Sequence, residues 1–301
     1  MKARLYIIIM LLTSTLVGCN WNNKSDKKDD ILAGEIPVAV DKTLLPIFLE
    51  QKEVFESSYY NANVAVIAEP EVQAVNALLR GDAGIAFLAR ELTEEERAHF
   101  DKRSVNGRVY PVGYDAIVLV TNTASTDTSI RVADVINMLK GNNYGNKKLV
   151  FDDLNSSILR QLIDIGDIDR VANTYVLTSA GSEGVLKEVS ASTDMIGVIS
   201  FNQLLSLKSS FSEMEKIRIL SVLNDKGGEQ KYVLPSQASL SLDEYPLKRT
   251  IYVLNYQPNM GLGIGLSAFL TGDRGQRILL KAGLLPATMP GREIIIRSEV
   301  N

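Results

Sequence analysis

Residues 64–96, VAVIAEPEVQAVNALLRGDAGIAFLARELTEEE, contain two strand patterns with a helix pattern between them. The runs 64–68 and 85–89 are short and rich in valine, isoleucine and other apolar residues, which is typical of buried strands. Between them, apolar residues recur at helical spacing from Pro70, a favoured first helical residue, to Arg80-Gly81, a helix stop. Strand, helix and strand in this order favour parallel strands with helical crossovers, so the stretch predicts an α/β fold.

The same alternation continues through the rest of the chain. Further apolar runs predict strands at residues 36–40, 116–120, 149–151, 175–177, 196–199, 251–254 and 293–297. Helical stripes lie between most of these runs, and Thr93 with Glu96 forms a capping box that predicts a helix start. Ligands of open α/β sheets bind outside the carboxyl ends of the strands, which places residues 41–43, 69–71 and 90–93 at one functional edge.

The N-terminus has the pattern of a lipoprotein signal peptide. A basic start precedes the apolar stretch 5–12, which is far shorter than the roughly 20 residues that a membrane-spanning helix needs. The run Leu16-Val17-Gly18-Cys19 resembles the lipobox of bacterial lipoproteins, in which the cysteine is lipidated and becomes the new N-terminus. The alternative is an ordinary secretory signal followed by a buried cysteine.

We therefore expect residues 1–19 to be a signal peptide that ends at Cys19, which would carry an acyl anchor of the palmitate type. Residues 20–33 are polar and charged and cannot bury enough apolar surface to order themselves, so we expect a flexible tether. The mature chain would then be extracytoplasmic, lipid-anchored to a bacterial membrane at its periplasmic face or at the cell surface.

Charge and cysteine content exclude several classes of protein. Loss of Lys2 and Arg4 with the leader takes the formal net charge from −4 to −6. A mildly acidic chain without a concentrated basic patch is not expected to bind nucleic acid. Cys19 is the only cysteine, so the chain has no disulfide and, once lipidated, no thiol for chemistry.

Four blocks carry a resemblance to a known family. They are EPEVQAVNALLRGDAGIAFLARELTEEE (residues 69–96), YPVGYDAIVLVTN (110–122), YPLKRTIY (245–252), and GQ (275–276) followed by GLLP (283–286). In this order they resemble the phosphate-binding family of periplasmic solute-binding proteins, the receptors of phosphate ABC transporters. The resemblance covers nearly the whole mature chain.

This resemblance implies a type II periplasmic-binding-protein fold, with two mixed, mainly parallel sheets flanked by helices and a cleft between two lobes. We expect residues 34–115 plus 248–301 to form lobe 1 and residues 116–247 to form lobe 2. The resemblance also implies a membrane-anchored monomer that captures a small anionic ligand, phosphate or a related oxyanion, by lobe closure. The ligand would be delivered to an ABC permease, and no cofactor is implied.

The chain departs from the family where the ligand would bind. Family members usually carry a Gly-Ser-Gly loop after the second strand, where this chain has Glu69-Pro70-Glu71. They usually carry an arginine and a Ser-Gly-Thr turn in the second lobe, where residues 151–157, FDDLNSS, have two carboxylates and no arginine. Carboxylates close to a phosphate dianion weaken its binding unless they point away. The sequence therefore leaves open whether the ligand is an oxyanion or a neutral or cationic solute.

Polar residues at the predicted helix starts are candidate ligand contacts. They are Thr43, Arg90, Asn155, Ser156 and Ser157, and Asp115 joins them at the presumed crossing between the lobes. Backbone N–H groups at helix N-termini, hydroxyls and arginine are the groups that bind oxyanions. Five of the candidates have a structural alternative: N-capping for the three hydroxyl residues, surface ion pairing for Arg90, and hinge packing for Asp115.

Catalytic and metal sites have little support in the sequence. The only histidine, His99, lies on a predicted solvated helix, and one histidine builds neither a histidine-based metal site nor an enclosed catalytic triad. We therefore expect no metal and no enzymatic activity. Two rival functions stay open: a ligand-sensing or scaffold lipoprotein of the same fold with a degenerate anion site, and a secreted hydrolase.

Overall fold

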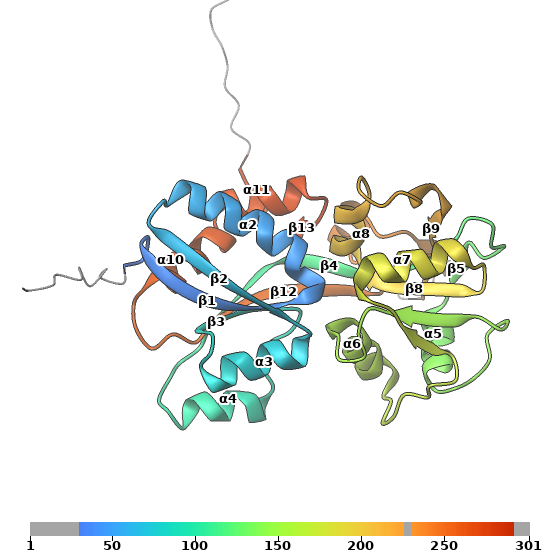
Figure 1. Cartoon of the computed structure of the whole chain (residues 1–301), viewed down its shortest axis with the longest axis horizontal. Coiled ribbons are helices and arrows are strands. Elements are labelled where there is room, and N and C mark those ends of the chain that lie inside the picture. Colours follow the sequence, from blue (N-terminus) through green and yellow to red (C-terminus); the bar gives the residue numbers. More distant parts are fainter. Residues whose placement is uncertain (1–29, 226–229, 292–301) are drawn as a thin grey trace, which may run out of the picture.

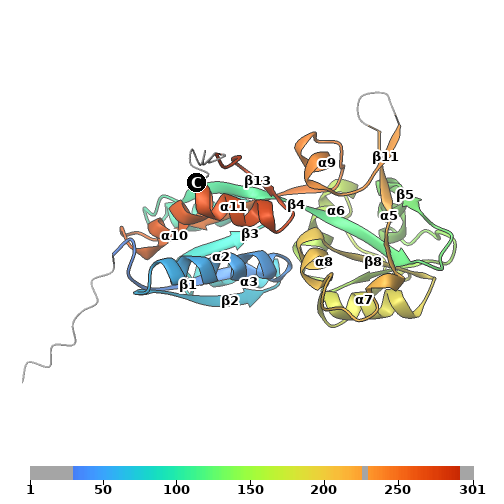
Figure 2. The same cartoon turned by 90° about the horizontal axis from the view of Figure 1, so that it is seen from above.

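Two α/β lobes are joined by two long antiparallel strands, β4 (Arg108–Asn122) and β12 (Lys248–Asn255) (Figure 1). The computed structural model describes residues 30–225 and 230–291. Seen from above, the lobes lie side by side along the long axis of the molecule (Figure 2). The two-lobed α/β fold predicted from the sequence is confirmed.

Lobe 1 begins with three parallel strands and the helices that connect them. Its first elements are β1 (Gly34–Asp41), η2 (Lys42–Leu44), α2 (Leu45–Ser58), β2 (Ala62–Glu69), α3 (Glu71–Arg80), β3 (Ile85–Leu88) and α4 (Glu94–Asp101). Strand β1 lies between β2 and β3 and is parallel to both. Helix α2 covers one face of this sheet, and α3 and α4 lie on the other (Figure 1). Gly81 ends α3 in the left-handed conformation with φ 83°, as the predicted helix stop requires.

Strands β4 and β12 carry the chain between the lobes. Arg249 in β12 pairs with Asp115 in β4, at the point where both strands pass from one lobe to the other. The strands follow one path in the order β2-β1-β3-β12-β4 and then onward into lobe 2. The predicted strand 116–120 is the second half of β4, which is longer because its first half belongs to the sheet of lobe 1.

Lobe 2 repeats the parallel arrangement on the far side of the crossing. Its strands and helices are β5 (Ser129–Ile130), α5 (Val132–Leu139), β6 (Lys148–Phe151), α6 (Ser157–Gly166), β7 (Val176–Thr178), α7 (Gly181–Ala191), β8 (Met195–Ser200), α8 (Phe201–Leu207), η3 (Met214–Lys216), β9 (Ile217–Ile219), β10 (Ser221–Asn224), β11 (Lys231–Val233) and α9 (Gln237–Ser241). Strand β6 is parallel to both β7 and β8, whereas β8 runs antiparallel to β4. The part of the main sheet in lobe 2 is therefore mixed, as expected, and β11, β10 and β5 form a separate three-stranded sheet.

The chain returns to lobe 1 after β12 and completes it with α10 (Leu262–Thr271), α11 (Asp273–Lys281) and β13 (Leu285–Pro286). A continuous set of buried apolar side chains runs through both lobes, and a second set packs α3 and α4 against the sheet of lobe 1. The predicted strand 293–297, the leader, and most of the tether lie outside the described residues. The residue boundaries of the two lobes stay a prediction.

Candidate ligand site between the lobes

A cavity of about 340 Å³ lies between the lobes. It is lined from lobe 1 by Asp41, Lys42, Thr43 and Pro70, and from lobe 2 by Asp152, Asp153, Ser156, Ala180 and Gly181. These residues lie at or just after the carboxyl ends of β1, β2, β6 and β7. The lobe 1 wall of the cavity therefore belongs to the strand ends that the sequence predicted as the functional edge.

Helix starts from both lobes meet at this cavity. Pro70 is the N-cap of α3, Ser156 the N-cap of α6, and Ala180 the N-cap of α7. Asp41 caps the short η2 turn that leads into α2. The first N–H groups of a helix have no partner within the helix and carry its positive dipole end, so they attract oxygen atoms with negative charge. The backbone around the cavity therefore favours an oxyanion.

Most of the charged side chains around the cavity are acidic, so their charge is opposite in sign to that of the helix N-termini. Burial raises the pKa of Asp41 to about 6, with the neighbouring Arg249 opposing this shift and the carboxylate of Glu71 adding to it. Burial also raises the pKa of Asp152, whose Oδ1 is buried without a hydrogen-bond partner in the described part of the chain. Lys42 is the basic residue among those that line the cavity. The cavity thus offers donors from the backbone and acceptors from the carboxylates.

A buried network behind the cavity connects both lobes with the crossing strands. Arg249 and Asp115 are 3% and 0% exposed, and Arg249 Nη2 donates to Asp115 Oδ2 at 2.6 Å. The same guanidinium donates through Nη1 to Ser157 Oγ at 2.8 Å and through Nη2 to Thr43 Oγ1 at 2.9 Å. The Thr43 and Ser157 hydroxyls are 3.0 Å apart. One arginine from the crossing therefore contacts lobe 1, lobe 2 and the partner strand at once.

Lobe 2 residues complete this network around Asp115. Ser200 Oγ donates to Asp115 Oδ2 at 2.8 Å, and the Asn202 backbone N–H donates to Oδ1 at 2.9 Å. The Asn202 side chain donates to the carbonyl oxygen of Thr43 at 3.1 Å. The Asp115 carboxylate accepts hydrogen bonds at both oxygens, as a buried charge requires.

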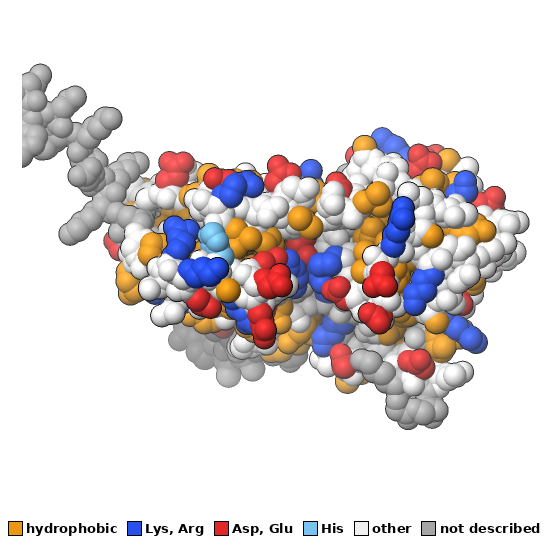
Figure 3. Space-filling view, turned by 90° about the horizontal axis from the view of Figure 1, so that it is seen from below, with side chains coloured by type: hydrophobic (Ala, Val, Ile, Leu, Met, Phe, Trp, Pro, Cys, Tyr) orange, Lys and Arg blue, Asp and Glu red, His pale blue; other side chains and the backbone are white. Residues whose placement is uncertain are grey.

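A second set of charges lies along the junction on the face shown in Figure 3, where basic and acidic side chains gather between the lobes. A groove of about 420 Å³ at the junction is lined by Ala89, Arg90, Glu91, Arg160, Gln161, Lys248, Arg249, Thr250 and Tyr252. Arg90 Nε donates to Glu71 Oε1 at 2.9 Å, and its two terminal nitrogens donate to Glu96 at 2.6 and 2.8 Å. Arg160 from α6 donates to the same Glu71 oxygen.

The structure places the predicted site residues in four different surroundings. Thr43 and Ser156 line the interlobe cavity, while Ser157 and Asp115 lie in the Arg249 network behind it. Arg90 lies in the groove, and Asn155 is exposed with its backbone N–H donating to Asp153. Their contacts with a ligand stay a prediction, and Cys19 lies outside the described residues.

The predicted N-capping alternative holds for one of the three hydroxyl residues, Ser156, and not for Thr43 or Ser157. Ser156 is an N-cap, since its Oγ accepts a hydrogen bond from the Leu159 N–H at 3.4 Å. Thr43 is not an N-cap, because Asp41 has that role and accepts from both the N–H and the hydroxyl of Thr43. Ser157 is the first helical residue of α6 and its hydroxyl is turned to Arg249.

Sequence reasoning missed Arg249, Arg160 and Lys42. Lys42 could have been predicted, because it lies between Asp41 and Thr43 at the predicted functional edge. Arg160 follows Ser156 by four residues, which places both on one face of a helix. Arg249 has no local signal, because its partner Asp115 is 134 residues away in the chain.

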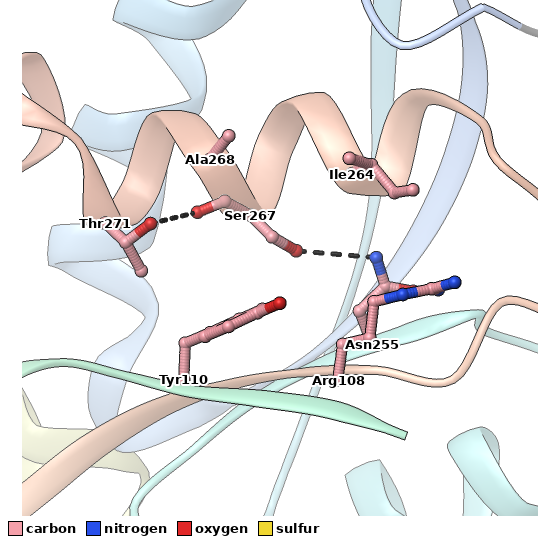
Figure 4. Close-up of a pocket in the computed structure, with 7 residues that line it drawn as sticks. All are labelled: Arg108, Tyr110, Asn255, Ile264, Ser267, Ala268 and Thr271. Carbon is pink, nitrogen blue, oxygen red and sulfur yellow. Dashed lines mark hydrogen bonds between the residues drawn. The ribbon is translucent and has the colours of Figure 1, made fainter. Parts of the chain in front are cut away.

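A separate pocket of about 280 Å³ lies within lobe 1 between α10 and the ends of β4 and β12 (Figure 4). Asn255 donates to the Ser267 hydroxyl there at 3.5 Å, and Tyr110 and Arg108 extend into the space from β4. This pocket contains none of the predicted site residues. His99 is exposed on α4, and the described residues contain no cluster of three or more His, Cys, Asp or Glu side chains that could hold a metal ion.

Comparison with known families matches most of the chain. A family model described as "PBP superfamily domain" matches residues 27–274. Protein SphX of Synechococcus elongatus is 25% identical over 228 residues, which are 70% of this chain and 65% of that protein. The match therefore spans 65% of the length of this curated relative.

Solved structures share the fold. A putative phosphate ABC transporter substrate-binding protein with bound phosphate from Clostridium perfringens superimposes with a TM-score of 0.69 at 15% identity, covering 85% of this chain and 100% of that one. An ABC-type phosphate transport receptor from Vibrio cholerae gives a TM-score of 0.64 at 17% identity, covering 84% and 100%. At these identities the likeness shows a common two-lobed fold.

Proposed function

We propose that this chain, which belongs to the PBP superfamily, is an extracytoplasmic solute-binding protein that captures a small oxyanion for an ABC-type transporter. The observation that carries the proposal is the interlobe cavity, at which the N-termini of α3, α6 and α7 meet. The similar structures, which are described as a putative phosphate ABC transporter substrate-binding protein and an ABC-type phosphate transport receptor, support phosphate or a related oxyanion as the ligand.

The mixed chemistry of the cavity favours an oxyanion that still carries protons. Helix N–H groups donate hydrogen bonds, whereas the carboxylates of Asp41, Asp152 and Asp153 accept them. A phosphate monoanion or dianion has both acceptor oxygens and a hydroxyl that can donate. Sulfate at neutral pH has no proton, and each carboxylate repels it. We therefore expect selection of phosphate over sulfate.

Lobe closure and membrane anchoring are further parts of this proposal. The ligand would contact lobe 1 at Thr43 and lobe 2 at Ser156, so it gains its full set of contacts only when the lobes are closed. A lipid on Cys19 and the tether 20–33 would hold the protein close to a membrane permease. Among the residues that the structure describes, no helix is both long and apolar enough to cross a bilayer. The protein would act as a monomer and would not turn its ligand over.

Equilibrium dialysis with radiolabelled phosphate tests the ligand. We expect saturable binding by the wild-type mature chain, and a large excess of sulfate should not displace the phosphate. Lys42→Ala should weaken binding by several-fold up to about tenfold, because a charge-assisted hydrogen bond contributes about 1.5–3 kcal/mol and Lys42 is partly screened by solvent. Lys102→Ala removes an exposed lysine outside the cavity and is the matched control. Absence of saturable binding would contradict the proposal.

A ligand-sensing or scaffold protein of the same fold is the second candidate. It is favoured by one observation, the buried carboxylate of Glu71, which holds Arg90 and Arg160 in ion pairs. A wild-type protein that binds no oxyanion in the dialysis experiment would support this candidate. A hydrolase would instead release phosphate from esters, an activity that we do not expect.

A further inference from the structure

Glu71 is a buried carboxylate at the junction of the lobes. Its side chain is 1% exposed, although it is the first residue of α3 and directly follows Pro70 at the wall of the interlobe cavity. Burial of a carboxylate is costly unless cations and hydrogen bonds compensate for the lost water. The compensating groups around Glu71 therefore reveal what kind of site it occupies.

Two arginines from different lobes hold this carboxylate. Arg90, which follows β3 in lobe 1, donates from Nε to Glu71 Oε1 at 2.9 Å. Arg160, on α6 in lobe 2, donates from Nε to the same oxygen and from Nη2 to Oε2 at 3.4 Å. Guanidinium groups converging on two oxygens of one anion are the usual means of binding a carboxylate or another oxyanion.

The two arginines are themselves held in place. Glu96 accepts hydrogen bonds from both terminal nitrogens of Arg90. Asp164, one helical turn from Arg160, accepts a hydrogen bond from its Nη1. Their Nε groups remain pointed at Glu71. Carboxylates other than Glu71 therefore also position the two arginines, so their Nε donors should keep facing the space that Glu71 leaves.

We propose that Arg90 and Arg160 form an oxyanion-binding site, the oxyanion seat, which the Glu71 carboxylate occupies as a built-in anion. The carboxylate thereby keeps free oxyanions out of the seat and holds the two lobes together. The role of these ion pairs in ligand capture rests on the proposed function, because contacts that hold the lobes together regulate how readily the lobes close around a ligand. Its test uses sulfate and lobe separation, and neither readout requires phosphate binding.

Radiolabelled sulfate measures whether the seat accepts a free anion. Wild type should not bind sulfate there, whereas Glu71→Ala removes the internal carboxylate and should bind sulfate at least about tenfold more tightly than wild type. Adding Arg160→Ala to Glu71→Ala should abolish this gain. Glu71→Gln should show no gain, because the amide still fills the seat. Glu91→Ala removes an exposed carboxylate at the same groove and is the matched control.

Lobe separation gives a second readout in the absence of any ligand. Glu71→Gln keeps the shape of the side chain but replaces the carboxylate with a neutral amide, whose oxygen can accept from an arginine without forming an ion pair. It should therefore raise the radius of gyration in small-angle scattering relative to wild type and Glu91→Ala. If Glu71→Ala is poorly folded, low-millimolar sulfate should raise its melting temperature clearly more than it raises that of wild type, with chloride at equal ionic strength as the reference for both proteins.

The outcomes separate the two proposals. A folded Glu71→Ala variant without sulfate binding, together with an unchanged radius of gyration for Glu71→Gln, would overturn the built-in anion. Gain of sulfate binding by Glu71→Ala would uphold it even if wild type fails to bind phosphate, in which case only the proposed function fails. Equal gain by Glu91→Ala would show a general charge effect and would also overturn the inference.

Discussion

Replacing Asp41 with asparagine should change how the stability of the protein depends on pH. Asp41 is fully buried, and its pKa is raised from 3.8 to about 6, chiefly by burial and against the opposing effect of Arg249. The folded state therefore holds the Asp41 proton more tightly than the unfolded state does. Between these two pKa values the free energy of unfolding falls as pH rises, and the loss is nearly complete by about pH 7.

The size of this effect follows from the shift. A rise of about two pKa units at about 1.4 kcal/mol per unit gives a total loss of about 3 kcal/mol, most of it between about pH 4 and pH 7. Asp41→Asn has no proton to lose, and its amide can accept from the Thr43 N–H and donate to the Thr43 hydroxyl, where Asp41 now makes contacts of 3.0 and 2.9 Å. Other titrating groups are common to both proteins and cancel in the difference.

Urea unfolding of wild type and Asp41→Asn across this pH range measures the difference. Relative to the variant, wild type should lose about 2–3 kcal/mol as pH rises from about 4 to about 7. Two parallel stability curves would instead show that burial does not raise the pKa of Asp41 in the folded protein.

Asp115→Ala should cost about 3–5 kcal/mol of unfolding free energy, because it leaves the charge of Arg249 buried without its partner. Asp115→Leu combined with Arg249→Met should cost clearly less in urea unfolding, and equal losses would contradict a buried ion pair at the crossing. Cys19→Ser should release the protein from the membrane fraction, because the proposed anchor is then absent. Firm membrane association of this variant after a carbonate wash would argue against lipidation.

Local signals in the sequence predicted most of the elements. The apolar run 64–68, the stripe that ends at Arg80-Gly81 and the capping box at Thr93 correspond to β2, α3 and the start of α4. These features depend on residues within one turn or one strand, where side-chain period and capping chemistry act directly. The resemblance supplied the two-lobed arrangement, which local patterns alone do not determine.

The polar contacts between the lobes could not be predicted in the same way. Thr43 and Ser156 were found because helix starts at strand ends are recognisable, and both line the cavity. The Glu71 contact with Arg160 joins residues 89 positions apart, so no local pattern reveals it. Asp115 was placed at the crossing, but its partner Arg249 lies in a strand pattern that gives no sign of a buried charge.

We propose that a protonated oxyanion binds between the lobes at the starts of α3, α6 and α7. Diffraction from crystals grown with arsenate, a protonated analogue of phosphate with an anomalous signal, locates the anion directly. We expect one strong anomalous peak in the wild-type protein within hydrogen-bond distance of Thr43, Ser156 and Gly181. A well-diffracting crystal with saturating arsenate and no peak between the lobes would contradict it.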